Sequence, residues 1–127
     1  MGVILLDTEA LIWWDGNDPR LGGHARAAIQ EASAVYVSAA SAWEIMIKVS
    51  LGKLRTSRRP LVAVEEAGFH ALPVTFEHAE AVRMLPRHHR DPFDRLIIAA
   101  AHVEGWAVLT SDAQFRRYDV EIIDARS

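Results

Sequence analysis

Four carboxylates in this sequence occur where strands are expected to end or helices to begin. Asp7 closes the apolar run V-I-L-L-D, and Asp94 is the second acid of R-D-P-F-D-R-L-I-I-A-A-A, residues 90–101. Glu44 lies in S-A-W-E-I-M, and Asp112 lies in L-T-S-D-A-Q. Carboxylates that gather in one place repel one another unless a cation neutralises them. Oxygen ligands without cysteine favour a hard divalent ion, so the four acids indicate a site for Mg²⁺, with Mn²⁺ as a substitute.

Two of these acids also have simpler interpretations. Asp7 could cap a short helix through T-E-A-L-I-W-W, because aspartate is a favoured N-cap residue. Glu44 could form an ion pair with Lys48 one helical turn further on, a contact that contributes little at a surface. Glu44 nevertheless borders the apolar row of its expected helix, so we expect it at the edge of the buried face.

The other two acids differ in how far helix capping explains them. Asp91, followed by a proline, reads as an N-cap, and Asp94 would then be mildly favoured in the first turn of the same helix. Near the end of the chain, Ser111 and Gln114 predict a capping box that leaves Asp112 without a capping role. We therefore assign Asp91 to the helix cap and take Asp94 and Asp112 as candidates for chemistry.

The elements that must position these acids are short apolar runs alternating with helical patterns. The runs barely alternate in polarity, which is typical of strands buried on both faces of a parallel sheet. We expect an α/β fold, an α/β/α sandwich with a central, mostly parallel sheet of four to five strands, forming a single domain over residues 1–127. The expected strands are 3–7, 34–38, 71–74, 106–110 and 120–124, and the expected helices are 21–32, 39–54, 60–69, 76–85 and 92–104.

The order of these elements brings the acids together. In a parallel sheet, the carboxyl ends of the strands and the starts of the following helices share one edge, and ligands bind there in open α/β folds. Asp7, Glu44, Asp94 and Asp112 all fall at this edge.

Composition excludes several other classes of protein. The chain has 127 residues, half of them apolar, and carries 14 basic and 17 acidic residues for a net charge of −3. Such a balance does not indicate general nucleic-acid binding, so contacts to nucleic acid must come from local basic clusters. The sequence contains no cysteine, and its first residues lack the pattern of a signal peptide. Its longest apolar run is too short to cross a bilayer, so we expect a soluble, cytoplasmic protein without a membrane partner.

Four segments in order resemble the PIN-domain family, and within it the VapC-type toxins of bacterial toxin–antitoxin pairs. The segments are L-L-D-T-E-A-L-I-W-W, S-A-A-S-A-W-E-I-M-I-K-V-S-L-G-K-L, R-D-P-F-D-R-L-I-I-A-A-A and L-T-S-D-A-Q-F. The resemblance covers nearly the whole chain. One departure is Glu9, where many relatives have histidine, and it makes the rim of the site more acidic.

The resemblance implies a function. It implies a metal-dependent endoribonuclease that cuts RNA and acts as a toxin, with Asp7, Glu44, Asp94 and Asp112 at the catalytic and metal-binding positions. Hydrolysis of a phosphodiester by metal-activated water fits such a set of carboxylates. The resemblance further implies supporting hydroxyls at Thr8 and Thr110, a cognate antitoxin partner and a homodimer.

Local basic groups are candidates for contact with RNA phosphates. R-H-H-R at residues 87–90 precedes the Asp91 cap, which places Arg87 and Arg90 near the acidic edge, and Lys48 and Arg116 are further candidates. We do not expect a zinc site at His88 and His89, because adjacent histidines point apart on a helix. Of the adjacent Trp13 and Trp14, we expect one to be available to a partner surface, because both cannot face one core.

An alternative function stays open at this point. The same acids could bind a regulatory metal, or accept a phosphoryl group, in a non-catalytic α/β binding module. Phosphoryl-accepting receiver domains normally place a lysine after a late strand, and W-A-V-L-T-S-D has none. The nuclease is therefore the favoured interpretation.

Overall fold

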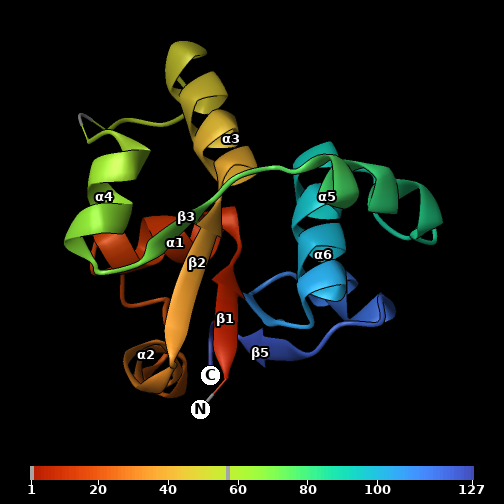
Figure 1. Cartoon of the computed structure of the whole chain (residues 1–127). Coiled ribbons are helices and arrows are strands. Elements are labelled where there is room, and N and C mark those ends of the chain that lie inside the picture. The colour runs from red at the N-terminus through yellow and green to blue at the C-terminus, as the bar shows by residue number, and fades with distance from the viewer. Residues whose placement is uncertain (1, 57) are drawn as a thin grey trace.

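The structure, a computed structural model, describes residues 2–56 and 58–127, and within them five strands form one parallel sheet in the order β3-β2-β1-β4-β5 (Figure 1). Residues 1 and 57 lie outside the described residues. The expected parallel sheet of four to five strands is therefore confirmed. The strands are β1 (Val3–Leu6), β2 (Ala34–Ser38), β3 (His70–Leu72), β4 (Ala107–Thr110) and β5 (Ile122–Asp124).

The central strand β1 is buried on both faces. It pairs in parallel with β2 on one side and β4 on the other. Ile4 and Leu6 point into one apolar cluster, and Leu5 between them points into a second cluster on the opposite face. Successive side chains of a strand point to opposite faces of the sheet, so an uninterrupted apolar run fits a strand covered on both sides.

Helices cover both faces of the sheet (Figure 1). One apolar cluster includes residues of α1, α2, α3 and α4, whereas the other includes residues of α6 and η2. Helix α5 packs against α6 on the outside of the second face. The helices are α1 (Thr8–Asp15), α2 (Gly23–Glu31), α3 (Ala39–Ser50), α4 (Pro60–Glu66), α5 (Phe76–Ala81) and α6 (Pro92–Glu104), with 3₁₀ turns η1 (Val82–Met84) and η2 (Ala113–Arg117).

Several expected boundaries shift in the structure. The expected helix at 76–85 is divided into α5 and η1, and the expected strand at 120–124 is reduced to β5. The helix expected at 39–54 ends at Ser50, because Gly52 adopts a left-handed backbone with φ 71°. Glycine tolerates that conformation, and it stops the helix there.

The tryptophan pair behaves differently from the expectation. Trp13 is buried, and Trp14 is half-buried against the same apolar cluster, with its ring centroid 5.5 Å from that of Phe69. The expectation that the two rings cannot face one core is therefore wrong, and the availability of the half-buried Trp14 to a partner stays a prediction. Helix α1 is short and lies against the sheet, so its core-facing side is wide enough to hold both rings.

Helix α6 begins and ends as its sequence predicts. The Asp91 carboxylate accepts hydrogen bonds from the backbone N–H groups of Phe93 and Asp94, at 2.9 and 3.2 Å, and Pro92 occupies the first helical position. The helix ends at Gly105, whose φ of 76° is left-handed. The assignment of Asp91 to the cap is confirmed. Among the described residues, no helix combines the length and apolarity needed to span a membrane.

Replacing the α6 cap should cost stability in a predictable way. Asp91→Ala removes an oxygen that accepts two backbone N–H groups, so we expect the free energy of unfolding to fall by about 0.5–2 kcal/mol. Asp91→Asn should be nearly neutral, because asparagine caps about as well as aspartate. Chemical denaturation of the two variants beside the parent chain measures the difference, and equal stability of Asp91→Ala and the parent would contradict the capping role.

Candidate active site

The four predicted acids come from elements that meet at the carboxyl edge of the sheet (Figure 1). Asp7 directly follows β1, and Asp112 follows β4, the neighbour of β1 in the sheet. Glu44 lies in α3, which begins directly after β2, and Asp94 lies in the first turn of α6. Strand order thus gathers residues that are more than a hundred positions apart.

Asp7 is buried with both carboxylate oxygens engaged. It is 5% exposed, its Oδ1 accepts from the Ala10 N–H at 2.8 Å, and its Oδ2 accepts from the Thr110 hydroxyl at 2.6 Å. Burial raises the pKa of Asp7 from its ordinary 3.8 to about 6; these two hydrogen bonds oppose the rise, and the charges of Glu9 and Asp112 add to it. The capping interpretation of Asp7 is therefore correct, and it coexists with a position at the acidic edge.

The two predicted hydroxyl groups each touch an acid. Thr110 accepts from the Asp112 N–H at 3.0 Å in addition to its bond with Asp7, so it links the ends of β1 and β4. Thr8 donates to Glu44 Oε1 at 2.6 Å, and its oxygen lies 2.9 Å from the Ser41 hydroxyl. Each threonine thus fixes the orientation of a carboxylate.

Glu44 is buried and has partners on both oxygens. Its Oε1 accepts from Thr8, and its Oε2 lies 3.2 Å from Lys48 Nζ. The ion pair considered as the simpler interpretation is therefore present. The expected position at the border of the buried face is also found, because Trp43 beside it is 62% exposed.

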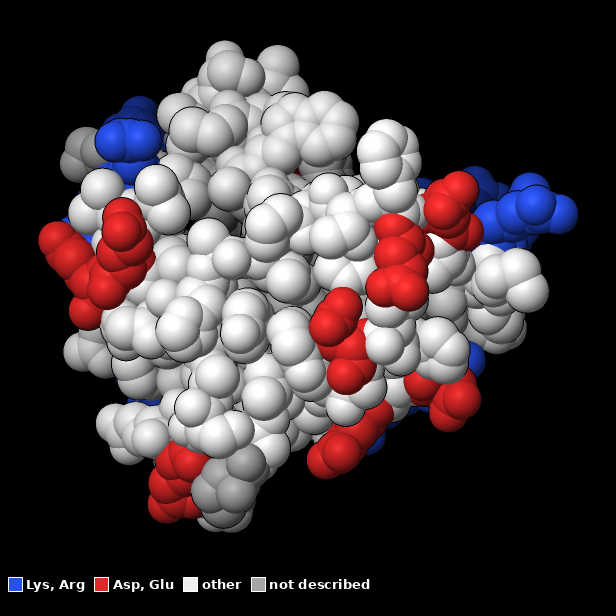
Figure 2. All heavy atoms as spheres, in the orientation of Figure 1, with Lys and Arg blue, Asp and Glu red and all other residues white. Residues whose placement is uncertain are grey.

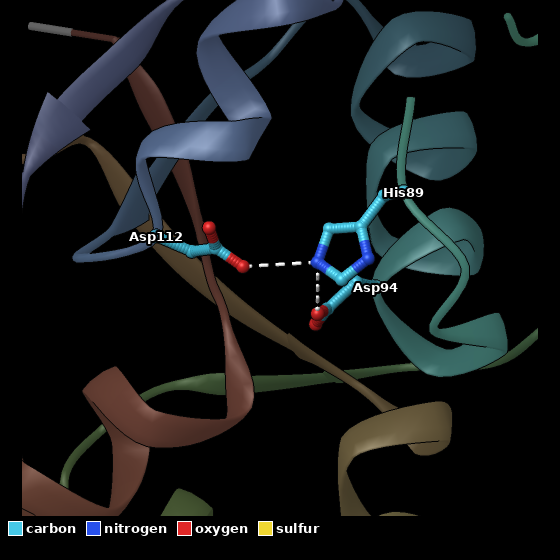
Figure 3. Close-up of side chains that lie close together, drawn as sticks. All are labelled: His89, Asp94 and Asp112. Atoms are coloured by element: carbon cyan, nitrogen blue, oxygen red, sulfur yellow. Dashed lines mark hydrogen bonds and ion pairs between the residues drawn. The ribbon is translucent and has the colours of Figure 1, made fainter. Parts of the chain in front are cut away.

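Asp94 and Asp112 face each other across a histidine (Figure 3). His89 Nε2 lies 2.9 Å from Asp94 Oδ2 and 2.9 Å from Asp112 Oδ2. Among the described residues, these three side chains form the group with ligand atoms mutually within 4.8 Å, close enough to hold a metal ion. Asp7 and Glu44 border this group without belonging to it.

The placement of His88 and His89 on a helix, assumed from the sequence, is wrong. Residues 85–91 form a loop rather than a helix, so His88 and His89 do not project from a helical surface. The His88 side chain is exposed, whereas the His89 ring points into the site and is only 12% exposed. The sequence did contain a signal for the position of His89. His89 is two residues before Asp91, the N-cap of α6, and Asp94 lies in the first turn of that helix, so the two side chains start close together.

The capping box expected after β4 is also wrong. Turn η2 starts at Ala113, so Asp112 rather than Ser111 occupies the N-cap position, and its Oδ1 accepts from the Gln114 N–H at 2.9 Å. The Ser111 hydroxyl donates instead to Glu9 at 3.1 Å. Asp112 therefore caps with one oxygen and presents the other to His89.

Electrostatic crowding is strongest at Asp94. Burial is the largest cause that raises its pKa, to about 7, followed by the charge of Asp91; His89 opposes the rise, and the charges of Asp7 and Glu44 add to it. A carboxyl group with a pKa so far above 3.8 is one whose charge is poorly compensated. The carboxylate oxygens therefore fit a hard divalent cation, which would supply the missing positive charge.

The predicted RNA-binding residues differ in their surroundings. Arg87, Arg90 and Arg116 are exposed, whereas Lys48 is engaged with Glu44. On the face drawn in Figure 2, basic side chains are visible mainly at the upper left and far right, whereas acidic side chains lie right of centre and also at the left and lower margins.

Comparisons with known proteins show what the chain resembles. It is 29% identical over 121 residues to Ribonuclease VapC22 of Mycobacterium tuberculosis (strain ATCC 25618 / H37Rv), covering 93% of each sequence. It is similar to a chain in the crystal structure of VapBC-5, a member of the VapBC family of toxin–antitoxin systems from Mycobacterium tuberculosis. That likeness has a TM-score of 0.66 and 25% identity, over 97% of this chain and 98% of the other.

A second solved structure agrees with the fold. A chain in the crystal structure of DNA-bound VapBC from Salmonella typhimurium matches with a TM-score of 0.72 and 22% identity, over 98% of both chains. The family described as PIN domain matches residues 4–121. Because this match spans most of the sequence, the chain belongs to the PIN-domain family.

Proposed function

We propose that this chain is a metal-dependent endoribonuclease, active as the toxin of a toxin–antitoxin pair and formed by one PIN domain over residues 1–127. The observation that carries the proposal is the convergence of Asp94 and Asp112, beside the buried Asp7, at the carboxyl edge of a PIN-domain sheet. The similarity to a protein named as a ribonuclease supports the choice of RNA as substrate.

Asp7, Asp94 and Asp112, with Glu44 beside them, would hold Mg²⁺, or Mn²⁺ in its place. Such an ion lowers the pKa of a bound water and neutralises charge on the phosphate. Asp94 and Asp112 each offer an oxygen to the group whose ligand atoms lie within 4.8 Å of one another. Thr8 and Thr110 orient the carboxylates of Glu44 and Asp7, respectively, through bonds of 2.6 Å.

RNA would approach over the loop that precedes α6. Arg87 and Arg90 flank His89 and are exposed, and Arg116 in η2 follows Asp112 by four residues. These guanidinium groups can contact phosphates on either side of the site. Lys48, held by Glu44, would contribute only after leaving that pair.

The proposed partners are a small antitoxin and a second copy of the chain, both acting in the cytoplasm. A guanidinium group from an antitoxin could satisfy the crowded carboxylates in place of the metal, because its fork matches carboxylate geometry. The solved relatives include toxin–antitoxin complexes, which supports this proposal.

Purified protein without a partner should cleave single-stranded or loop RNA when Mg²⁺ or Mn²⁺ is added. Splayed nucleotides reach an edge site more easily than paired ones. EDTA should abolish the cleavage, and excess Mg²⁺ should restore it. Gel analysis of a labelled RNA measures both steps, and undiminished cleavage in EDTA would contradict a metal mechanism.

Asp94→Asn should separate activity from stability. It removes one carboxylate, so we expect RNA cleavage and Mn²⁺ binding to fall to background. Because the pKa of Asp94 is raised to about 7 in the folded state from 3.8, the folded chain binds more protons than the unfolded chain between these values. The metal-free parent should therefore lose stability as pH rises from about 4 to 7, and Asp94→Asn should lose less.

Thermal melts in EDTA at pH 5 and pH 8, beside cleavage assays, measure both effects. Asp91→Asn is the matched control, since it removes a neighbouring aspartate charge while keeping the helix cap. An active Asp94→Asn chain with a lowered melting temperature would show that Asp94 is only a first-turn helix acid.

Expression of the chain alone in bacteria should slow growth, whereas expression of Asp94→Asn at the same level should not. The physical reason is loss of RNA cleavage without loss of the fold. Growth curves with immunoblots of protein level measure this, and light scattering of the purified chain tests the homodimer. Equal growth of the two strains would contradict the toxin role while leaving nuclease activity in vitro to be judged separately.

A further inference from the structure

Several hydrogen bonds fix the position of His89 in the acidic site. The loop that carries it is fastened to the Tyr118 hydroxyl, which accepts from the His88 and His89 N–H groups at 3.1 and 2.8 Å. Arg95 donates to the carbonyls of Pro86 and Val82, at 3.0 and 3.1 Å, and so closes the same loop. These contacts hold the imidazole between Asp94 and Asp112 (Figure 3).

The hydrogen bonds of the ring define its tautomer. Nδ1 of His89 accepts from the Asp91 backbone N–H at 3.2 Å, so Nδ1 carries no proton. In the neutral ring the proton is then on Nε2, which is hydrogen-bonded to Asp112 Oδ2 at 2.9 Å, and Asp94 Oδ2 also lies 2.9 Å from Nε2. His89 Nε2 thus lies between two oxygens that a cation would also bind.

A histidine that binds a metal is normally oriented the opposite way. Its ligating nitrogen has no proton, and its other nitrogen donates to a carbonyl or a carboxylate. Here the second nitrogen faces a backbone N–H, which cannot accept a proton. Ligation through Nε2 would require the proton to move to Nδ1 and would break the bond from Asp91.

We propose that His89 is a positioning residue that acts as a removable substitute for the metal: in the metal-free site its Nε2–H donates to Asp112 and lies beside Asp94, and it must give up these contacts when the cation binds. This inference rests on the proposed metal-dependent function. It adds that His89 lowers the affinity of the site for the metal.

The consequence for metal binding follows from linkage. Interactions that exist only in the metal-free state lower the affinity for the metal, because binding must replace them. An N–H that points toward a cation is repelled, so the bonds of His89 belong to the metal-free state. Removing His89 should therefore destabilise the metal-free protein and tighten metal binding at the same time.

The test compares three variants of the full chain with the parent, using Mn²⁺ alone as the probe. His89→Ala removes the donor, whereas His89→Gln keeps an N–H group at a similar distance along the side chain. His88→Ala is the matched control, because the neighbouring histidine contacts Tyr118 and is exposed. Mn²⁺ affinity is measured by electron paramagnetic resonance titration, and stability by melts with EDTA and with Mn²⁺.

For His89→Ala we expect Mn²⁺ to bind about ten-fold more tightly, the change that one hydrogen bond to a charged group produces. Its melting temperature in EDTA should fall, and the increase in melting temperature on adding Mn²⁺ should be larger than in the parent. His89→Gln should remain close to the parent, and His88→Ala should match it in affinity.

Two results would overturn the inference and leave the proposed metal-dependent nuclease function intact. Weaker Mn²⁺ binding by His89→Ala, together with a ¹⁴N coupling in pulsed resonance spectra of the parent, would show that His89 is a ligand. Unchanged affinity would show that it is structural only. Failure of the parent to bind Mn²⁺ would overturn both this inference and the metal-dependent function.

Discussion

The hydrogen bond from Thr110 to Asp7 is the interaction on which the acidic edge depends. It joins the ends of the neighbouring strands β1 and β4 at 2.6 Å, and both side chains are buried. Thr110 also receives the Asp112 N–H, so one side chain sets the position of the first acid and of the backbone that carries the last. A hydroxyl serves both needs because it donates once and accepts at the same oxygen.

The acidic residues of the site also hold the fold together. Asp7 caps α1 and Asp112 caps η2, each through one backbone N–H, and Asp91 caps α6 through two. Three local helix starts therefore bring carboxylates to one edge at little cost, because negative charge is favoured at a helix N-terminus. The metal-free chain can therefore tolerate several carboxylates at one edge. A carboxylate in this site can also cap a helix and take part in chemistry at the same time.

The remaining repulsion falls mainly on Asp94. Its pKa rises to about 7 because it is poorly solvated and close to other acids, and His89 is the group that opposes the rise. The balance between carboxylate repulsion and one imidazole N–H sets how readily this edge accepts a cation. If other groups of the protein fully compensated the carboxylate charges, a bound metal ion would add little electrostatic stabilisation.

The sequence by itself determined the parallel sheet, the approximate positions of its strands and the cap of α6. Apolar runs with little alternation and a proline after Asp91 depend on local geometry, which a single segment carries. The sequence also predicted, from the shared carboxyl edge of a parallel sheet, that Asp7, Glu44, Asp94 and Asp112 lie at one edge.

The tertiary structure alone decided which atoms meet there. His89 enters the site because Tyr118, distant in sequence, and Arg95, in the following helix, shape its loop. Asp112 caps η2 because the turn begins one residue later than the Ser111 pattern suggests. Both Trp13 and Trp14 fit one core because α1 lies against the sheet. Such outcomes depend on contacts between segments far apart in the chain, and local sequence patterns carry no information on the distances between them.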